Sequence, residues 1–423
     1  MAIIQQMSIF AYINVELVGD LERLKLALEG INSEWLIRKL EAKRKHGRDD
    51  YPVRVMWNLI VAMIVFGHKT VESFRRELAR NSQLRRVCGL YDWDGRRHLV
   101  PPSRVFSGFL KSLSEEQEEV SRIFEGEVAA LYELLPGFGR TMAGDGKYVD
   151  SVANHKPKEE QTDTDNRTEN DAQWSSKEYH YTDSNGKAQV KKEYHFGFKA
   201  HIICDVDTEL PIAYSLTPAN ADEKKEMIKL LGSPLLSDEK RRRIAEHLLL
   251  DRGYDSAEMI RAIKSAGIAP VIDIRNCWKD GEATKQYKDT NIVYNYRGDV
   301  FFVKDDGDGN PQKMKYEGYD RQKKCLRYSY ERKMYKIYIS YDERVFLPIA
   351  RDSDKFKKLY KGRTAVERLN GRLDRDYMFE DHCIRGLKKM ALMLSLSLIV
   401  MNGMAVGKLK NGKEMIRSLK NAA

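Results

Sequence analysis

The spacing of apolar residues changes at about Arg140, and this change constrains the fold more than any other feature of the sequence. Over residues 21–135 the apolar residues recur at helical intervals, as in Leu59, Met63 and Phe66. After Arg140 the chain contains short runs rich in Val, Ile, Tyr and Phe, which favour β-strands. We therefore predict an all-helical region over residues 1–135, followed by a region that mixes strands and helices.

The mixed region has its predicted elements in a defined order. Strands are predicted in TMAGDGKYVDSVA, EYHFGFKAHIICDVDT, ELPIAYSLTPA, the LLL run at 248–250, and APVIDI. Helices are predicted in DEKKEMIKLL, before the fourth strand, and in DSAEMIRAIKSAG, before the fifth. Three strands, a helix, a strand, a helix and a strand are the order of a ribonuclease-H-like fold. We predict such an α/β core, a mixed sheet with helices, over residues 136–274 and 351–423.

Two aspartates occupy positions on or directly after these strands where an acidic side chain is suited to bind a metal ion or to take part in catalysis. Asp145 lies between two glycines, where little side-chain bulk obstructs a metal ion or a phosphate, although Gly-Asp-Gly is also a common turn. Asp251 follows the apolar run 248–250, and open α/β sheets place ligand-binding groups at the carboxyl ends of such strands. Carboxylates from separate elements are suitable ligands for Mg²⁺.

A third acidic candidate comes from residues 360–376, which are predicted to form a helix. At 3.6 residues per turn its polar side chains fall within roughly 60° of one another: Tyr360, Arg363, Glu367 and Asp374. Its apolar side chains form a separate stripe: Val366, Leu369 and Leu373. Taken alone, an Arg–Glu pair four residues apart also occurs on many ordinary surface helices.

Two segments interrupt the predicted core. Residues 155–192 are mostly polar, with almost nothing to bury, and are predicted to be a loop insert without secondary structure. Residues 275–350 alternate aromatic and β-branched residues with polar ones, which predicts an inserted antiparallel β domain. Trp278 and the basic residues of this insertion either stack on unpaired bases and hold phosphates, or belong to the packed faces of a sheet.

The helical residues 1–135 have two interpretations. Small basic helices separated by tight turns, as in TVESFRRELARNSQLRRVCGL, occur in helix-turn-helix proteins that bind the DNA major groove. A plain helical bundle with a solvated basic face has the same pattern. The residues alone do not separate the two.

Charge, cysteine spacing and hydropathy bear on the partners that the chain can have. With 73 Lys and Arg against 63 Asp and Glu, the net charge of +10 favours a polyanionic partner without establishing one. The five cysteines are scattered and never paired as CxxC, so neither a disulfide framework nor a zinc site is indicated. The most apolar segment, residues 390–401, is too short to span a bilayer, so we expect no membrane partner.

With these motifs the chain resembles the DDE transposases of bacterial insertion sequences, in the branch with a β-rich insertion before the catalytic glutamate. The resemblance rests on Gly-Asp-Gly-Lys around Asp145, on Leu-Asp-Arg-Gly-Tyr-Asp-Ser around Asp251, and on the Tyr-x2-Arg-x3-Glu spacing of Tyr360, Arg363 and Glu367. It extends to the N-terminal helical region, which would bind DNA, and so covers most of the chain.

The resemblance implies a site and a reaction. Asp145, Asp251 and Glu367 would be the catalytic residues and would hold two Mg²⁺ ions, with Mn²⁺ as a possible substitute. Two such ions about 3.5–4 Å apart activate a water and stabilise the leaving oxyanion of phosphodiester cleavage. The released 3′-hydroxyl would then attack target DNA. The expected partners are the element's terminal inverted repeats, target DNA and a second copy of the chain, in a cytoplasmic, nucleoid-associated location.

The resemblance also implies which residues contact DNA. Tyr360 and Arg363 would position the backbone of the transposon end. The family signature usually has a Lys seven residues after the glutamate, whereas this chain has Asp374 there. Arg372 or Arg375 would then substitute, or the phosphate contact is lost. Further candidates for DNA contact are Lys147, Arg252 and Trp278.

Other functions compete with an active transposase. A metal-dependent nuclease or resolvase would share the three carboxylates but would not recognise terminal inverted repeats. A transposase-derived DNA-binding protein would have lost catalysis, which the three intact acidic residues argue against and Asp374 mildly favours. A glycosidase fits poorly, because it needs only two carboxylates and no basic helical domain. With 22 tyrosines in the chain, residue counts alone do not exclude a recombinase that uses a tyrosine as covalent nucleophile.

Overall fold

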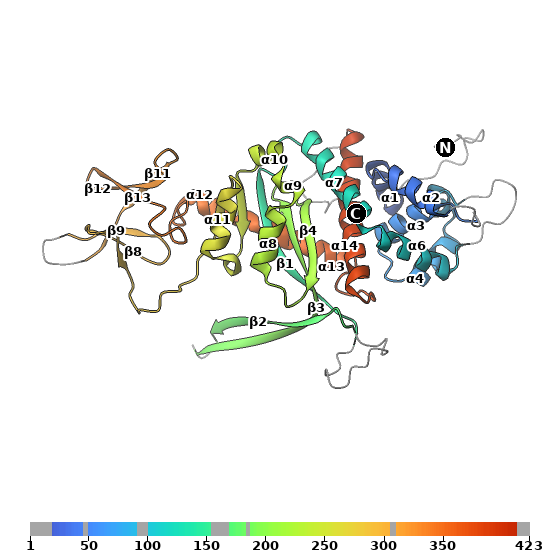
Figure 1. Ribbon diagram of the computed structural model, residues 1–423, viewed down its shortest axis with the longest axis horizontal. Helices are drawn as coiled ribbons and strands as arrows, with labels where there is room; N and C mark the ends of the chain where they lie inside the picture. The colour runs from blue at the N-terminus through green and yellow to red at the C-terminus, as the bar shows by residue number, and fades with distance from the viewer. Residues whose placement is uncertain are drawn as a thin grey trace. The chain divides into compact units, whose positions relative to one another are not determined.

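The computed structural model describes residues 19–44, 50–90, 100–153, 169–182, 187–304 and 310–412 (Figure 1). Its contacts divide the chain into two compact units. One contains the described residues of Met1–Ala130, Asp376–Cys383 and Leu392–Ala423, and the other those of Leu131–Arg375 and Ile384–Ala391. This division differs from the prediction that all of residues 351–423 belong to the α/β core, because residues 376–383 and 392–412 make their contacts within the first unit.

Within the described part of residues 19–134, the regular secondary structure is helical, as the apolar spacing predicts. The helices are α1 (Asp20–Gly30), α2 (Glu34–Arg44), α3 (Val53–Val65), α4 (Val71–Arg80), α5 (Ser82–Val87), α6 (Ser103–Glu115) and α7 (Gln117–Leu134). Local signals set several helix ends; the Thr70 hydroxyl, for example, accepts the Ser73 N–H at the start of α4. Asn81 separates α4 from α5 and caps α5 through the Leu84 N–H.

Helix α14 (Leu387–Lys410) contacts α1 at very close range through glycines. A Cβ added at Gly30 would lie 1.8 Å from the Gly403 carbonyl oxygen, and one added at Gly407 would lie 2.1 Å from the Leu26 carbonyl oxygen. The helix is longer than the apolar stretch 390–401 and, by length and composition alone, could cross a membrane. However, 89% of its apolar window is buried inside the protein, as expected of a core helix.

The second unit is built on a mixed six-stranded sheet. Its strands are β1 (Thr141–Asp150), β2 (Gln173–Thr182), β3 (Ala188–Asp205), β4 (Pro211–Pro218), β5 (His247–Leu250) and β6 (Ala269–Ile272). They follow the order β2-β3-β1-β5-β6, with β4 paired to β3. The pairs among β1 to β4 are antiparallel, whereas β5 is parallel to both β1 and β6. Asp145 therefore lies within a strand and not in a Gly-Asp-Gly turn.

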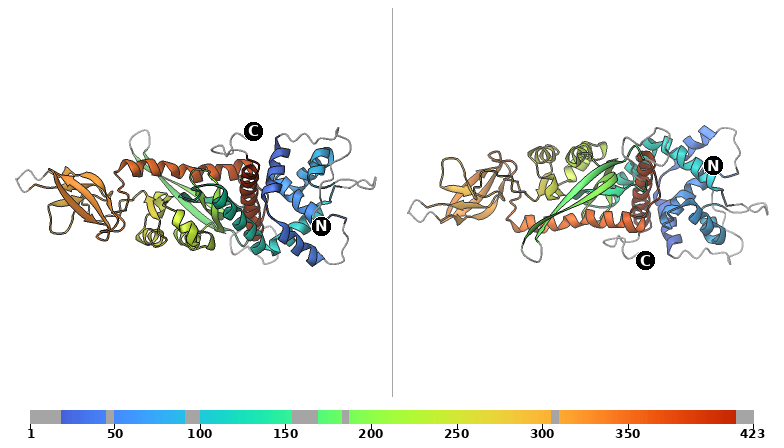
Figure 2. Two further views of the ribbon diagram at one scale, coloured as in Figure 1. Left: turned by 90° about the horizontal axis from the view of Figure 1, so that it is seen from above. Right: turned by 90° about the horizontal axis from the view of Figure 1, so that it is seen from below.

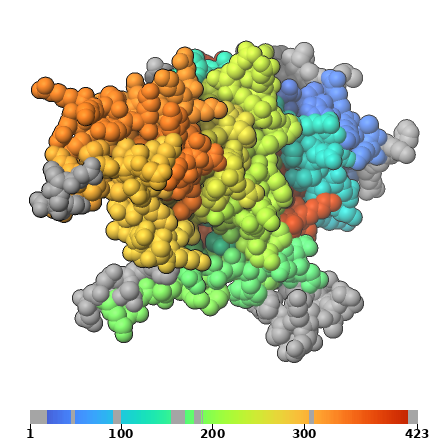
Figure 3. All heavy atoms as spheres, turned by 60° about the vertical axis from the view of Figure 1, so that its left-hand side comes forward, coloured from blue at the N-terminus to red at the C-terminus, as the bar shows by residue number. Residues whose placement is uncertain are grey.

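Part of the predicted polar loop at 155–192 is a β-hairpin. Strand β2 pairs with the first part of β3 from Gln173↔Gly197 to Thr182↔Ala188, and the hairpin projects beyond the rest of the sheet (Figures 1 and 3). The loop prediction is wrong for residues 173–182 and 188–192, because β3 continues without a break from a buried strand and pairs with β2 through backbone hydrogen bonds. Residues 154–168 and 183–186 lie outside the described residues.

Helices cover both faces of the sheet. On one face lie α8 (Glu223–Leu231), α9 (Pro234–Ser237), α10 (Glu239–Ile244) and α11 (Ala257–Ser265), and on the other α12 (Asp354–Tyr360) and α13 (Thr364–Asp376) (Figure 2). Short 3₁₀ turns follow β5 (η2, Arg252–Tyr254) and join α12 to α13 (η3, Lys361–Arg363). Residues 360–376 are thus not one α-helix. The apolar stripe of α13 is nevertheless buried as predicted, with Val366, Leu369 and Leu373 fully covered.

The predicted β insertion forms two small antiparallel sheets in the described residues. Strands β7 (Lys285–Gln286), β8 (Ile292–Tyr294), β9 (Val300–Phe302) and β10 (Gln312–Lys313) make one, and β11 (Lys315–Asp320), β12 (Cys325–Tyr330) and β13 (Lys333–Tyr338) make the other. They share a core of buried aromatic and aliphatic side chains that includes Tyr328 and Phe346. Much of the insertion's aromatic pattern therefore belongs to packing.

Candidate active site

The pairing of β1 with β5 brings Asp145 and Asp251 together. The parallel register matches Met142 with Leu248 and Ala143 with Leu249. Two residues further along, Asp145 within β1 and Asp251 directly after β5 therefore lie at the same height. The Asp251 carboxylate accepts the Gly253 N–H at 2.6 Å and so caps the turn η2. A Cβ at Gly253 would lie 2.7 Å from that same oxygen, so a side chain there would displace the Asp251 carboxylate.

The electrostatics of the two aspartates follow from this geometry. Burial, and to a lesser extent the neighbouring carboxylate of Asp251, raise the pKa of Asp145 to about 6. That value includes a small further rise from Glu223 and the opposing effects of the Gly146 N–H and the Arg363 guanidinium. A buried carboxyl beside two other acidic groups is stabilised in its ionised form by a nearby cation.

A cleft of about 890 Å³ opens over these side chains. Core residues that line it include Asp145, Asp251 and Glu223, the β2 strand contributes Ser176–Glu178, and the chain that enters the insertion contributes Arg275 and Asn276. Tyr296 and Arg297 line it from within the insertion. The cleft therefore combines acidic groups on the core with basic and aromatic groups around them.

Glu223 and Lys199 also belong to this site, and no motif in the sequence predicts their part in it. Glu223 is the first residue of α8, after the Asp222 cap, and its carboxylate lies 2.6 Å from the Lys199 ammonium. The Lys199 side chain is only 4% exposed and also lies 4.2 Å from the centre of the Tyr148 ring. The sequence offers one signal for Lys199, which is a lysine within the otherwise largely apolar strand segment 196–204.

Glu367 is engaged elsewhere. It lies in the first turn of α13, and its carboxylate accepts a hydrogen bond from the Arg363 guanidinium at 2.5 Å. Arg363 is also close enough to Asp145 to lower the pKa of that carboxyl, so the guanidinium interacts with both Glu367 and Asp145. Among the described residues, no group of three or more His, Cys, Asp or Glu side chains is close enough to hold a metal ion. The structure thus brings together two of the three predicted carboxylates.

Tyr360 lies close to the aspartates on the other side of the turn η3. Burial raises the pKa of its hydroxyl, and the nearby carboxylates of Asp273 and Asp251 contribute to the rise. Its ring stacks on Phe356, with centroids 5.6 Å apart. Tyr360 and Arg363 therefore both lie near the acidic groups, and their contact with the transposon end stays a prediction.

The other residues predicted to contact DNA differ in their location and in whether they already have partners within the protein. Arg252 lines the cleft, where its Nε donates to Asp273 at 3.0 Å. Trp278 packs against the core of the insertion, with Lys285 over its ring. Lys147 is in an ion pair with Asp374, and Arg375 is exposed.

Arg372 does not fit the predicted role of a DNA contact. It is only 6% exposed, its guanidinium donates to the Glu209 carbonyl oxygen, and it faces the Glu209 carboxylate at 3.7 Å. The prediction was wrong because Arg372 lies on the buried side of α13, one position before Leu373.

Together, the mixed sheet and the paired aspartates define an α/β protein with an acidic cleft. Residues 154–402 match the family model "Transposase DDE domain", which covers more than half of the chain, so this chain belongs to that family. No curated protein matches the sequence.

Similar solved structures include a piggyBac transposase synaptic complex with hairpin DNA, at 10% identity and a TM-score of 0.37, covering 95% of this chain and 78% of that one. A second is a pre-cleavage Mos1 transpososome, at 13% identity and a TM-score of 0.17, covering 56% of this chain and 77% of that one.

Proposed function

We propose that this protein is the transposase of an insertion sequence, which binds the element's terminal inverted repeats, cleaves DNA at the ends and joins the 3′-hydroxyl ends to target DNA. The proposal rests on membership of the transposase DDE family. The observation that carries it is the pair Asp145 and Asp251, which neighbouring parallel strands hold at the same height inside a cleft. The order β4-β3-β1-β5-β6, three antiparallel strands followed by two parallel ones, supports a ribonuclease-H-like core.

The acidic side chains fit a hard divalent cation, because carboxylate oxygens are the ligands that Mg²⁺ and Mn²⁺ prefer. Asp145 and Asp251 would hold it, with Glu367 or Glu223 as the third ligand. When bound, two such ions activate water and stabilise the leaving oxyanion of a phosphodiester. The raised pKa of Asp145 supports this assignment, because it reflects an acidic site that lacks a compensating charge.

The residues around the carboxylates would hold the DNA strand. Arg363 would bind a phosphate after exchanging its contact with Glu367, since a guanidinium forms paired hydrogen bonds to either group. That exchange would also free Glu367 to act as a ligand. The Tyr360 hydroxyl, which is protonated at neutral pH, would donate a hydrogen bond to the backbone of the same strand.

The partners follow from the reaction. Joining two element ends calls for two active sites, so we propose a homodimer in the DNA complex. The helices of residues 1–135 would bind the terminal repeats, and the protein would act at the nucleoid in the cytoplasm. The net charge of +10 supports a DNA partner.

A metal-dependent nuclease without strand transfer is the second candidate, and a DNA-binding protein that has lost catalysis is the third. The Glu367–Arg363 contact favours the third candidate, because it leaves only two of the predicted carboxylates together in the described residues. Asp374 no longer argues for lost function by itself, since it has an internal partner in Lys147.

The test is Mg²⁺- or Mn²⁺-dependent cleavage of DNA that carries the native flanking ends, followed by assay of strand transfer. Wild type is compared with Asp145→Ala, Asp251→Ala and Glu367→Ala, and with Glu239→Ala, which removes an 81% exposed carboxylate outside the cleft. We expect cleavage and joining by wild type and by the control, and DNA binding without cleavage by the three variants. Cleavage without joining would support the nuclease, and binding without cleavage by wild type would support the third candidate.

A further inference from the structure

Two arginines line the cleft from the side of the insertion. Arg275 follows β6 on the segment that enters the insertion, and Arg297 lies in the turn between β8 and β9. Both side chains belong to exposed residues, and both line the same cleft as Asp145 and Asp251. They therefore place positive charge in the cleft that contains the acidic pair.

Neither guanidinium forms a salt bridge within the described residues, although Arg297 is near enough to Asp273 and Asp299 to lower the pKa of both carboxyls. The other arginine of the cleft, Arg252, is paired with Asp273. In contrast, no salt bridge and no side-chain hydrogen bond of Arg275 or Arg297 is found in the part of the chain that the structure describes. An exposed arginine that forms no salt bridge of its own is available to bind an anion in the cleft.

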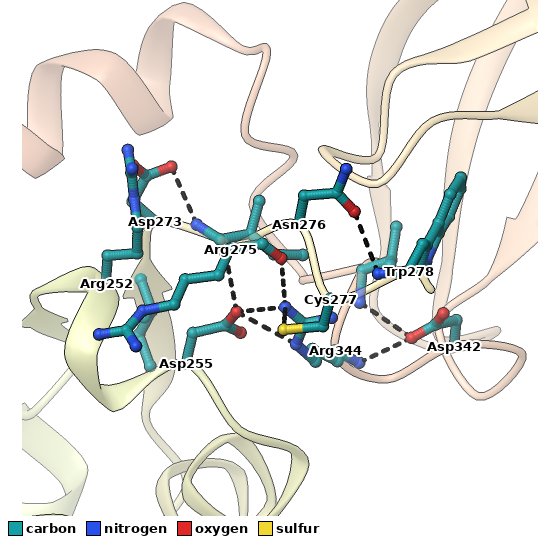
Figure 4. Close-up of polar contacts among 12 residues, drawn as sticks. Arg252, Asp255, Asp273, Arg275, Asn276, Cys277, Trp278, Asp342 and Arg344 are labelled. Atoms are coloured by element: carbon teal, nitrogen blue, oxygen red, sulfur yellow. Dashed lines mark hydrogen bonds and ion pairs between the residues drawn. The ribbon is translucent and has the colours of Figure 1, made fainter. Parts of the chain in front are cut away.

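The backbone of Arg275 is held on both sides. Its N–H donates to Asp255 Oδ2 at 3.0 Å, and its carbonyl oxygen accepts a hydrogen bond from Arg344. Arg344 in turn donates to Asp255 Oδ2 from Nε at 3.1 Å and from Nη2 at 2.6 Å. Figure 4 shows this network, with the Arg275 side chain extending away from Arg344 and Trp278.

The backbone of Arg297 is held by its own turn. The Asn295 side-chain oxygen accepts the N–H groups of Arg297 and Asp299, each at 3.0 Å. Gly298 follows with a φ of +88°, and a Cβ there would lie 3.0 Å from the Val345 carbonyl oxygen. The turn is therefore tight and lies against the segment that leaves the insertion.

We propose that Arg275 and Arg297 bind phosphates of the DNA strand that enters the cleft. This inference rests on the proposed function. Because the backbone at both positions is already held, binding requires no further ordering of the chain there, and the planar fork of a guanidinium matches the oxygens of a phosphate. Positive charge on this wall offsets the repulsion between the DNA backbone and the acidic pair.

The test measures DNA binding without divalent metal, so that it does not depend on cleavage. The affinity for a duplex carrying the element end is measured by fluorescence anisotropy at several KCl concentrations, for wild type, Arg275→Gln, Arg297→Gln and the double variant. Each lost phosphate contact lowers the slope of log affinity against log salt by about 0.9. We expect a reduction of about 1 for each single variant and about 2 for the double variant.

Two sets of variants complete the experiment. Arg275→Lys with Arg297→Lys keeps both charges and should restore most of the slope. Arg242→Gln removes an exposed arginine of α10 outside the cleft and should leave the slope unchanged. A double Gln variant with the wild-type slope would overturn the inference while the proposed function, judged by wild-type cleavage, would stand. Wild type that neither binds nor cleaves the DNA would overturn both.

Discussion

Lys147 and Asp374 form an ion pair that joins strand β1 to helix α13, with the Lys147 Nζ 2.6 Å from one carboxylate oxygen and 2.7 Å from the other. The two side chains are 14% and 28% exposed. The same strand carries Asp145, and the same helix carries Glu367. The pair thus connects the elements that supply two of the predicted catalytic residues, and it accounts for an acidic residue where the family signature has Lys.

Reversing this pair should show that it contributes to stability. Asp374→Lys places two ammonium groups together, so we expect the free energy of unfolding to fall by about 1–3 kcal/mol. Lys147→Asp with Asp374→Lys should recover part of this loss, with a coupling energy of about 0.5–3 kcal/mol in a double-mutant cycle. Reversal of the exposed pair Arg243–Glu239 is the control and should cost at most about 1 kcal/mol. Additive effects at 147 and 374 in urea denaturation would contradict the assignment.

Gly362 should tolerate a side chain poorly. It lies in η3 between Tyr360 and Arg363, and a Cβ there would lie 2.8 Å from Val206 Cγ1 and 3.1 Å from Leu249 Cδ2. Gly362→Ala should therefore push the turn off the sheet, lower stability by about 1–3 kcal/mol and reduce DNA cleavage.

Gly371 supplies the matched control, because it lies in α13 with no atom within 4 Å of an added Cβ. Gly371→Ala should raise stability by about 0.5–1 kcal/mol, since alanine is the better helix former. Equal effects of the two substitutions in chemical denaturation would count against the close approach at Gly362.

Asp255 should control how firmly the insertion is attached. Its side chain is fully buried and accepts hydrogen bonds from Arg344 and from the Arg275 backbone. Asp255→Asn removes the charge that compensates Arg344, so we expect a loss of about 3–5 kcal/mol in stability.

The thiol of Cys277 reports on this junction, because it lies 3.2 Å from the Arg344 guanidinium. In a Cys383→Ser background Cys277 is the one exposed cysteine, since the other three are buried. Asp255→Asn should change its rate of reaction with a thiol reagent, whereas Asp280→Asn, at an exposed pair with Lys285, should not. An unchanged rate in Asp255→Asn would show that the junction does not depend on this contact.

Glu127 should make the stability of the helical unit depend on pH. It is 3% exposed, neither carboxylate oxygen has a hydrogen-bond partner in the described structure, and burial raises its pKa well above the usual 4.5. Because the folded-state pKa is the higher one, stability is greatest below about pH 4.5 and falls as the pH rises toward the folded-state pKa.

Glu127→Gln should remove this dependence and raise the free energy of unfolding at neutral pH by about 1–3 kcal/mol. Glu125→Gln, two residues earlier on the same helix, is the control. Thermal unfolding from pH 4 to pH 8 would check this, and a Glu127→Gln variant with the wild-type pH profile would show that the carboxyl is not responsible.

Much of the architecture could be predicted because it depends on local interactions. Apolar spacing placed the buried stripe of α13, and short polar side chains marked helix starts such as Thr70 and Asp222. The β2–β3 hairpin was missed because its pairing depends on a neighbouring strand and not on its own composition.

The candidate site likewise has features that local sequence patterns predict and features that depend on tertiary packing. The sequence by itself determined the elements that carry Asp145, Asp251 and Glu367, since strand and helix periodicity depend on residues near one another in the chain. Only the tertiary structure decided that Asp145 faces Asp251, that Glu367 contacts Arg363, and which charged groups pair. The physical reason is that these contacts depend on strand register and on the rotation of α13 against the sheet, which are set by packing between segments far apart in sequence.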